Sequence, residues 1–316
     1  MSTLSLYLLH KTPTILLTFF SFSVIISEMR TLTTLQINKF YDSYKNLNVT
    51  FTRDVISAIG LRPEQIMLRC GGEQWACIMN SASMMQAKVI CELKSNIVTA
   101  LKENHQSLSL RFAFNENDGK ETVAFFVSGK VINISTFQAK TNNYILVSIE
   151  YTQKAPDDLI EKLGLLLEAN INATKRSSER LALSDDNIRK IDLISRDAFV
   201  FVQGIPRRCV LIDISFAGVK LILVGVANFL MGQEATVKFD FDHPQTTIGV
   251  KGKIVRAEHV EGRKDLIAVA IDFKKDEVPI IFKMHLNKFF GQHKISREIE
   301  TAQQAEEQTS PAPDRI

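Results

Sequence analysis

Two short groups of polar residues in this chain combine the side chains that bind phosphates and purine bases. Arg176 and Arg180 stand four residues apart, and about thirty residues later come Asp213, Ser215 and Gly218. An arginine guanidinium is planar and stays charged, so it can hold a phosphate, the O6/N7 edge of a guanine, or the face of a base. A carboxylate only accepts hydrogen bonds, whereas N1 and N2 of guanine donate them. A guanine dinucleotide with two phosphates would suit this set.

The second group follows an apolar run that predicts a β-strand. Asp213 and Ser215 are two residues apart, so a strand would place both on one face, and Gly218 would allow a turn or a close backbone approach. Each group also has a plainer explanation. Two arginines four apart are common in solvated linkers, and Asp-x-Ser-x-x-Gly is typical of a strand that ends in a Ser/Gly turn. The order of the two groups and the strand-like segments after them favour the binding interpretation.

Together, the patterns Arg176-Ser-Ser-Glu-Arg180 and Asp213-Ile-Ser215-Phe-Ala-Gly218 resemble the signature of PilZ domains. These domains are small β-barrels that bind the bacterial second messenger cyclic di-GMP. The resemblance implies that the two arginines contact phosphate and guanine, that the aspartate and the serine meet the other guanine edge, and that the glycine leaves room for the ligand.

The resemblance covers residues 174–292 closely. Within that span Lys175, Arg207 and Arg208 are candidate auxiliary ligand-binding charges. For the last two, a solvated strand end is an equally good explanation. No departure from the core signature is visible, so the sequence does not indicate a copy that has lost its ligand.

Length and composition predict a two-domain globular protein. The chain has 316 residues, of which 45% are hydrophobic and 23% charged, and its formal net charge of +3 is too small to favour duplex nucleic acid as a partner. The cysteines show no C-x-x-C spacing and the histidines form no ligand motif, so we expect reduced, mostly buried thiols and no metal. The four cysteines are Cys70, Cys77, Cys91 and Cys209.

The first domain, expected over residues 29–170, begins with helices and continues with short strands. Helices are predicted over residues 33–46 and 52–60, and Gly71-Gly72 predicts a hairpin turn. Several short strands with hairpin turns favour a small barrel. The domain also resembles, more loosely, the N-terminal companion domain of two-domain PilZ receptors of the spirochaetal kind, notably over residues 69–77 and 156–161. A helix over residues 156–169 should close this domain.

The second domain, expected over residues 185–293, predicts a six-stranded barrel with a C-terminal helix. Its predicted strands are followed by an amphipathic helix over residues 279–290, which would cap one opening of the barrel. The fold class is therefore mainly β with flanking helices, in two small β-barrel domains. The strands are predicted at residues 198–203, 207–214, 219–224, 235–241, 247–255 and 266–273.

Three further segments complete the predicted organisation. The polar linker over residues 171–184, which carries both arginines, should be mobile without ligand and ordered with it. The tail over residues 294–316 is rich in Gln, Glu, Thr and Pro and is expected to be disordered. Residues 1–28 form an apolar extension, and either the folded protein starts at Met29 or residues 13–27 anchor it to the inner membrane.

The sequence favours a receptor over an enzyme. It contains no Gly-rich phosphate loop opening a helix, no serine nucleophile elbow and no histidine-based metal pair. The expected protein is a cytoplasmic monomer that binds cyclic di-GMP, needs no cofactor, and changes the relative orientation of its domains. The resemblance implies a downstream protein partner of flagellar or regulatory type and an output in motility or related signalling. The alternative is an adaptor that binds proteins without any ligand.

Overall fold

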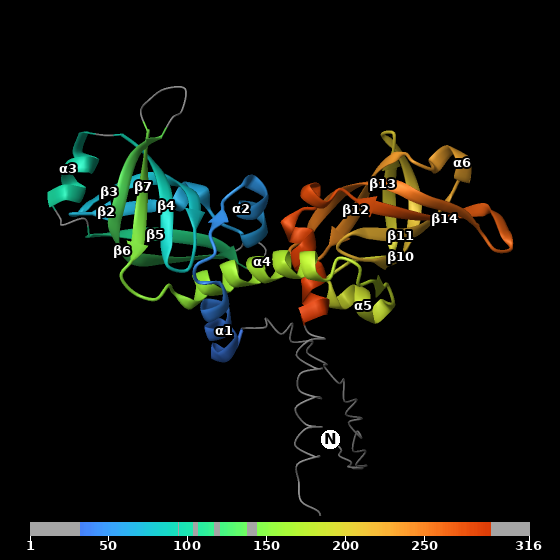
Figure 1. Ribbon diagram of the computed structural model, residues 1–316, viewed down its shortest axis with the longest axis horizontal. Coiled ribbons are helices and arrows are strands. Elements are labelled where there is room, and N and C mark those ends of the chain that lie inside the picture. The colour runs from blue at the N-terminus through green and yellow to red at the C-terminus, as the bar shows by residue number, and fades with distance from the viewer. Residues whose placement is uncertain (1–31, 94, 104–106, 117–120, 138–143, 292–316) are drawn as a thin grey trace, which may run out of the picture.

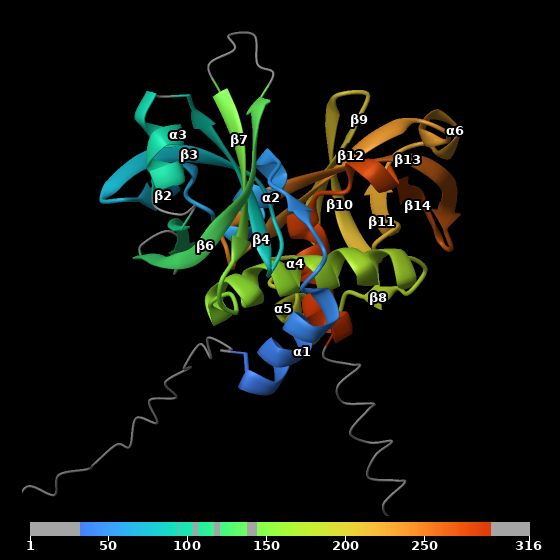
Figure 2. The same cartoon turned by 60° about the vertical axis from the view of Figure 1, so that its left-hand side comes forward.

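Two β-barrels lie side by side and are connected by one long helix, α4 (Asp157–Lys175), as Figure 1 shows. The computed structural model describes residues 32–93, 95–103, 107–116, 121–137 and 144–291. Figure 2, turned by 60°, shows that α4 extends from the first barrel to the second. The two candidate groups of polar residues therefore belong to the second barrel and to the end of the helix that leads into it.

The first barrel is a closed ring of six antiparallel strands. Its order around the ring is β3-β2-β5-β6-β7-β4, and β4 pairs back with β3, while the short β1 (Val49–Thr50) extends the edge of β3. Alternating side chains of these strands fill the interior with apolar groups. The ring strands are β2 (Met67–Cys70), β3 (Glu73–Ala82), β4 (Gln86–Glu92), β5 (Ser107–Glu116), β6 (Glu121–Phe137) and β7 (Tyr144–Tyr151).

Two helices at the start of this domain lie where the sequence predicted them. Thr33 and Gln36 form a capping box at the start of α1 (Thr34–Tyr44). Thr52 caps α2 (Arg53–Ile59), which ends at Gly60 with φ of 68°. A further helix, α3 (Ser95–Glu103), follows β4.

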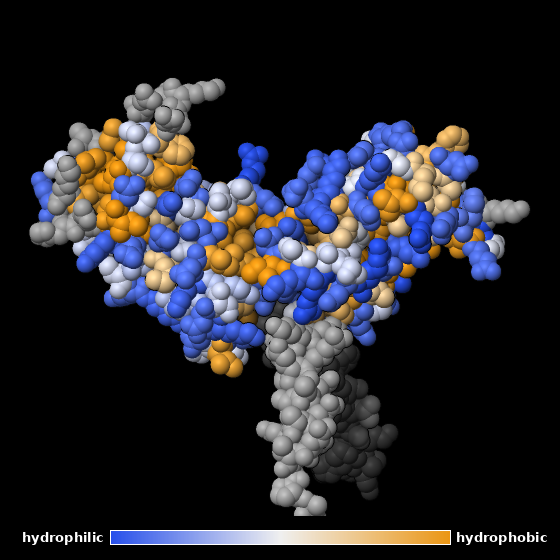
Figure 3. Space-filling model, viewed as in Figure 1, coloured by the Kyte–Doolittle hydropathy of each residue, from blue (hydrophilic) through white to orange (hydrophobic). Residues whose placement is uncertain are grey.

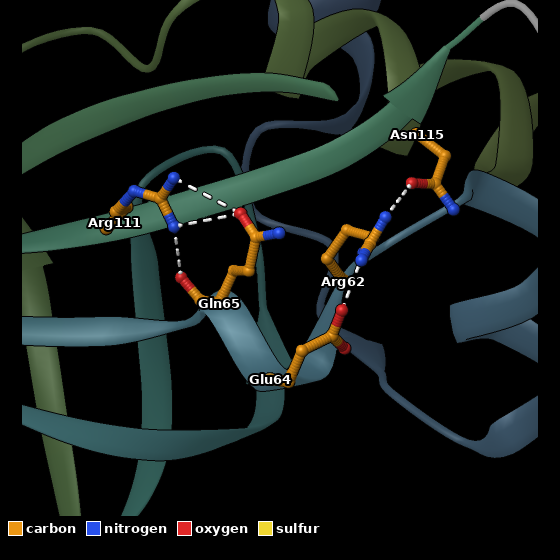
Figure 4. A network of polar contacts seen from close by, with 5 residues as sticks. All are labelled: Arg62, Glu64, Gln65, Arg111 and Asn115. Atoms are coloured by element: carbon orange, nitrogen blue, oxygen red, sulfur yellow. Dashed lines mark hydrogen bonds and ion pairs between the residues drawn. The ribbon is translucent and has the colours of Figure 1, made fainter. Parts of the chain in front are cut away.

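Figure 4 shows the polar network that fixes the segment between α2 and β2. The guanidinium of Arg111, on β5, donates to the backbone oxygen of Gln65 at 2.8 Å and to its side-chain oxygen. Arg62 donates to Glu64 at 2.6 Å and to Asn115 at 2.9 Å. These contacts tie the short 3-10 helix η1 (Pro63–Gln65) to the neighbouring strand β5.

The second barrel confirms the predicted six-stranded ring. Its strands follow the order β11-β14-β13-β12-β9-β10, and β10 pairs with β11 to close the ring. Outside the ring lie the short strand β8 and the helices α5, α6 and η3. The elements are β8 (Leu181–Ala182), α5 (Asp185–Lys190), β9 (Asp197–Val202), β10 (Ile205–Ile214), β11 (Gly218–Val224), α6 (Ala227–Leu230), β12 (Glu234–Phe241), β13 (Thr246–Val260), β14 (Arg263–Phe273) and η3 (Lys275–Glu277).

The helix over residues 280–291, called here the C-terminal helix, packs against both domains. Phe282 and Leu286 are fully buried in the core of the second barrel, whereas Ile280 belongs to the core of the first. The backbone N–H of Ile280 donates to Oδ2 of Asp54, in the first turn of α2, at 2.9 Å. A carboxylate from one domain thus satisfies an unpaired N–H at the start of a helix from the other.

The segment predicted as a linker over residues 171–184 includes the end of a helix and the short strand β8. Its mobility without ligand stays a prediction. Helix α4 does not end near Ala169 but continues to Lys175, and Leu181 is buried where β8 pairs with β10. The reason is tertiary: Ala173 packs against the second core, and Asn170 and Asn172 bond to the C-terminal helix. Such contacts override the weak helix propensity of asparagine and threonine.

Several sequence expectations meet different outcomes here. All four cysteines are free and buried, as predicted. Among the described helices, none combines the length and apolar character needed to cross a membrane. The predictions for residues 1–28 and 294–316 lie outside the described residues. Figure 3 shows apolar surface on both barrels and between them, with a broad area on the first barrel. The exposed apolar residues of the first barrel include Ile78, Phe126 and Ile132.

The burial of His285 in the C-terminal helix predicts that stability falls in weak acid. Its ring stacks on Phe241 with centroids 3.9 Å apart, and Nδ1 lies 3.1 Å from the oxygen of Ile191. Burial lowers the pKa of His285, although the carboxylate of Asp192, 3.4 Å away, opposes this shift. His285 therefore takes up a proton more readily in the unfolded chain than in the folded protein. The contribution of the neutral, buried ring to the free energy of unfolding is complete above about pH 6.5 and is lost as pH falls.

Urea unfolding at about pH 7 and pH 5.5 tests this prediction. We expect His285→Phe to lose less free energy of unfolding than the parent between these two pH values. His259→Gln is the control, because His259 lies exposed on β13, and this variant should keep the pH dependence of the parent. The same dependence in His285→Phe as in the parent would contradict the prediction.

Candidate nucleotide-binding site

The structure brings Arg180 and Asp213 into direct contact at one end of the second barrel. Nη1 of Arg180 lies 2.5 Å from Oδ1 of Asp213, with the side chains 47% and 20% exposed. The pairing of β8 with β10 explains the contact, because Ala182 lies opposite Asp213 and Leu181 opposite Ile214. Arg180, one residue before β8, is thereby held beside the carboxylate. Both groups remain accessible to a ligand from solvent.

Arg176 lies at the junction of α4 and the C-terminal helix. It is the C-cap of α4, and its backbone N–H donates to the oxygen of Asn172 at 2.8 Å. Its Nη1 donates to the backbone oxygen of Phe290 at 3.1 Å and lies 3.6 Å from Oε2 of Glu179. A cation at this place is favourable, because the last carbonyls of a helix carry partial negative charge.

Ser215 occupies a different position from the one the sequence predicted. Strand β10 ends at Ile214 and its register shifts between Leu211 and Asp213, so Ser215 does not share a strand face with Asp213. The serine is buried, and its Oγ accepts from the N–H of Gly218 at 3.0 Å and donates to the oxygen of Gly218 at 3.1 Å. Its hydroxyl therefore holds the turn between β10 and β11.

Gly218 is required by a close approach of the backbone. A Cβ at this position would lie 2.4 Å from the backbone oxygen of Ile271, on the paired strand β14. The prediction that this glycine permits a close backbone approach is correct. The space that it leaves is occupied by the neighbouring strand.

Of the three candidate auxiliary residues, only Lys175 lies near Arg176, Arg180 and Asp213. Lys175 is the last residue of α4 and is exposed beside Arg176. Arg207 and Arg208 pair with Val200 and Phe199 near the opposite end of β10. At about 3.3 Å per residue, they lie on the order of 20 Å along the strand from Asp213. We therefore leave these two arginines out of the site.

Two residues that the sequence did not single out also border the site. Lys220 lies directly across from Asp213 in the pairing of β10 with β11, and it is exposed. Phe216, inside the turn, packs its ring against that of Phe290, with centroids 5.3 Å apart. Sequence reasoning could have found Lys220, because pairing the two predicted strands across the Ser215–Gly218 turn places it opposite Asp213. The contact between Phe216 and Phe290 depends on the tertiary position of the C-terminal helix.

The arrangement is suited to binding an anion with hydrogen-bonding bases. Two guanidiniums, one carboxylate and a nearby lysine supply donors for phosphate and an acceptor for a guanine edge. Within the described residues, no group of three His, Cys, Asp or Glu side chains could hold a metal ion. A surface hollow of about 260 Å³ lies elsewhere, lined by Phe201, Gln203 and Lys251 among others, and includes none of the candidate residues.

Comparison with known protein families matches both halves of the chain. The PilZN3 domain matches residues 35–170, and the PilZ domain matches residues 174–287. A protein of Treponema denticola called "Cyclic di-GMP binding protein" is 48% identical over 256 residues, which are 81% of this chain and 82% of that protein.

Two solved structures are also similar to this chain. The PlzA protein of Borreliella burgdorferi in complex with c-di-GMP has 24% sequence identity and a TM-score of 0.38, with 82% of this chain and all of that chain covered. YcgR of Escherichia coli in complex with c-di-GMP has 11% identity and a TM-score of 0.26, with 79% and 91% covered.

The geometry of Gly218 predicts a destabilised variant. Gly218→Ala forces β14 to move away from the turn, and overpacking of this kind costs on the order of 1–3 kcal/mol of unfolding free energy. Gly249→Ala is the matched control, since a Cβ there would meet only the side-chain methyl of Thr236 at 3.3 Å. Urea denaturation of both variants provides the comparison. Equal losses would mean that the approach of Ile271 is not the constraint.

Proposed function

Since the chain belongs to the family of PilZ-domain proteins, we propose that it is a receptor for cyclic di-GMP that binds at Arg176, Arg180 and Asp213. The contact of Arg180 with Asp213 carries this proposal, because it joins the two separated halves of the sequence signature in one accessible site. The relative from Treponema denticola, called a cyclic di-GMP binding protein, supports it.

Each residue of the site has a distinct part in the proposed complex. The two guanidiniums bind phosphate oxygens and a guanine, and the carboxylate of Asp213 accepts from guanine N1 and N2. Ser215 and Gly218 act by shaping the turn that follows Asp213. Lys220 and Lys175 add positive charge at the edges of the site.

Binding requires the ligand to replace contacts that the protein makes with itself. Arg180 is paired with Asp213, and Arg176 donates to the oxygen of Phe290. An exposed ion pair contributes only about 0–1 kcal/mol, so a charged ligand can compete with it. A shift of Arg176 moves the end of α4 together with the C-terminal helix that is bonded to it. The other end of α4 is buried in the first core through Leu159 and Leu163.

We therefore propose that the ligand changes the relative orientation of the two barrels through α4. A ligand shifts such an equilibrium only by differential contacts in the two states, and the exchanged arginine contacts supply this difference. The protein would act without catalysis, by presenting this changed arrangement to a downstream protein. Regulation of motility or of a related signalling process is the proposed output.

Replacement of either arginine tests the site. Arg176→Ala or Arg180→Ala should weaken cyclic di-GMP binding by about thirtyfold or more, because loss of a charge-assisted contact to a partly desolvated anion costs on the order of 2–5 kcal/mol. Isothermal titration calorimetry measures the affinities. Arg208→Ala, at the far end of β10, is the matched control and should bind like the parent.

The affinities of the variants and of the parent test the site and the ligand separately. If both arginine variants bind as tightly as the parent, the assigned residues are wrong. If the parent itself does not bind cyclic di-GMP, the protein is instead a ligand-independent adaptor.

Amide hydrogen exchange tests the proposed conformational response. Residues 176–184 hold β8 and the two arginines, so saturating cyclic di-GMP should slow their exchange, while the paired strands β13 and β14 should change little. Unchanged exchange over residues 176–184 at saturation would show that this segment does not close on the ligand.

A further inference from the structure

A ladder of polar contacts joins α4 to the C-terminal helix and ends at Arg176. Glu168, Asn172 and Arg176 are spaced four residues apart, so they lie on one face of α4. Figures 1 and 2 both show the C-terminal helix crossing this end of α4. All three α4 side chains bond to that helix, at Asn287 or at the oxygen of Phe290.

Asn287 is the central contact of this ladder. Its Oδ1 accepts from Nδ2 of Asn172 at 2.7 Å, and its Nδ2 donates to Oε2 of Glu168 at 3.1 Å. The residue is only 6% exposed. A buried amide satisfied at both ends fixes the rotation and the register of the two helices, because any shift leaves a polar group unpaired.

The fixed register determines where the Arg176 guanidinium lies. Asn172 bonds to Asn287 through its side chain and, through its backbone oxygen, accepts the N–H of Arg176 at 2.8 Å. Phe290, whose oxygen receives the guanidinium, is three residues after Asn287 on the same helix. The ring of Phe290 also packs on Phe216, between Asp213 and Gly218. The C-terminal helix thus contacts both halves of the signature.

We propose that Asn287 is a positioning residue for Arg176, which it holds through Asn172 in the place from which it binds the ligand. Asn287 itself does not contact the ligand in the proposed complex. The inference rests on the proposed binding of cyclic di-GMP.

Two substitutions remove the contact in different ways. Asn287→Leu keeps the branched shape of the side chain but leaves Asn172 and Glu168 without their partner. Asn172→Ala removes the same hydrogen bond and places the best helix former in α4, so it should not unfold the helix. Each should weaken cyclic di-GMP binding by about tenfold, the equivalent of a well-formed buried hydrogen bond. The matched control is Lys283→Gln, since Lys283 lies one turn earlier and bonds to Asn170 at 3.0 Å.

A double-mutant cycle with Arg176→Ala distinguishes positioning from a general structural effect. If Asn287 acts through Arg176, Asn287→Leu should cost no further affinity once Arg176 is alanine. Calorimetric titration with cyclic di-GMP of the parent, the single variants and the double variant measures this coupling. Chemical denaturation identifies any variant that does not fold, and Asn172→Ala then replaces Asn287→Leu in the cycle.

The outcomes are distinguishable. The inference is supported if both amide variants lose about tenfold and these losses vanish in the Arg176→Ala background. It is overturned if the amide variants bind like the parent, if Lys283→Gln loses as much as they do, or if the losses persist in that background. If Arg176→Ala itself binds like the parent, the proposed site fails and this inference fails with it.

Discussion

One short helix packs against both barrels and connects their two cores. Residues 280–291 place Ile280 in the first core and Phe282 and Leu286 in the second. The same helix receives the carboxylate of Asp54 at its start and the guanidinium of Arg176 near its end. Because these contacts lie on one rigid element, the arrangement of the two domains and the position of a binding arginine are linked.

The polar side chains of the candidate site bond to one another and to the backbone. Arg180 is paired with Asp213, and Arg176 with the oxygen of Phe290. Because the ion pair is partly exposed, it contributes little to stability. In the proposed complex, a ligand that offers phosphates to the guanidiniums and guanine donors to the carboxylate exchanges these partners with little loss. The proposed mode of binding therefore combines preorganised arginines with a structural response.

The sequence predicted the parts of the structure that depend on local patterns. Alternation of apolar residues located the strands of the second barrel, and Thr52 and Gly60 marked the ends of α2 correctly. Prediction from the sequence failed where tertiary contacts determine the local structure. Helix α4 continues past Ala169 because its asparagines bond to a helix more than a hundred residues later, and the bulge before Asp213 turns Ser215 into the interior. The position of Arg180 depends on the two-residue strand β8, which is too short to show a pattern.

A crystal structure of the complex with cyclic di-GMP is the sharpest test of the proposed site. We expect the guanidiniums of Arg176 and Arg180 to lie within hydrogen-bonding distance of the ligand and Asp213 to accept from a guanine edge. We also expect the bond from Arg176 to the Phe290 oxygen to be broken. Ligand bound elsewhere on the barrels, or bound while both arginines keep their internal partners, would contradict the proposed site.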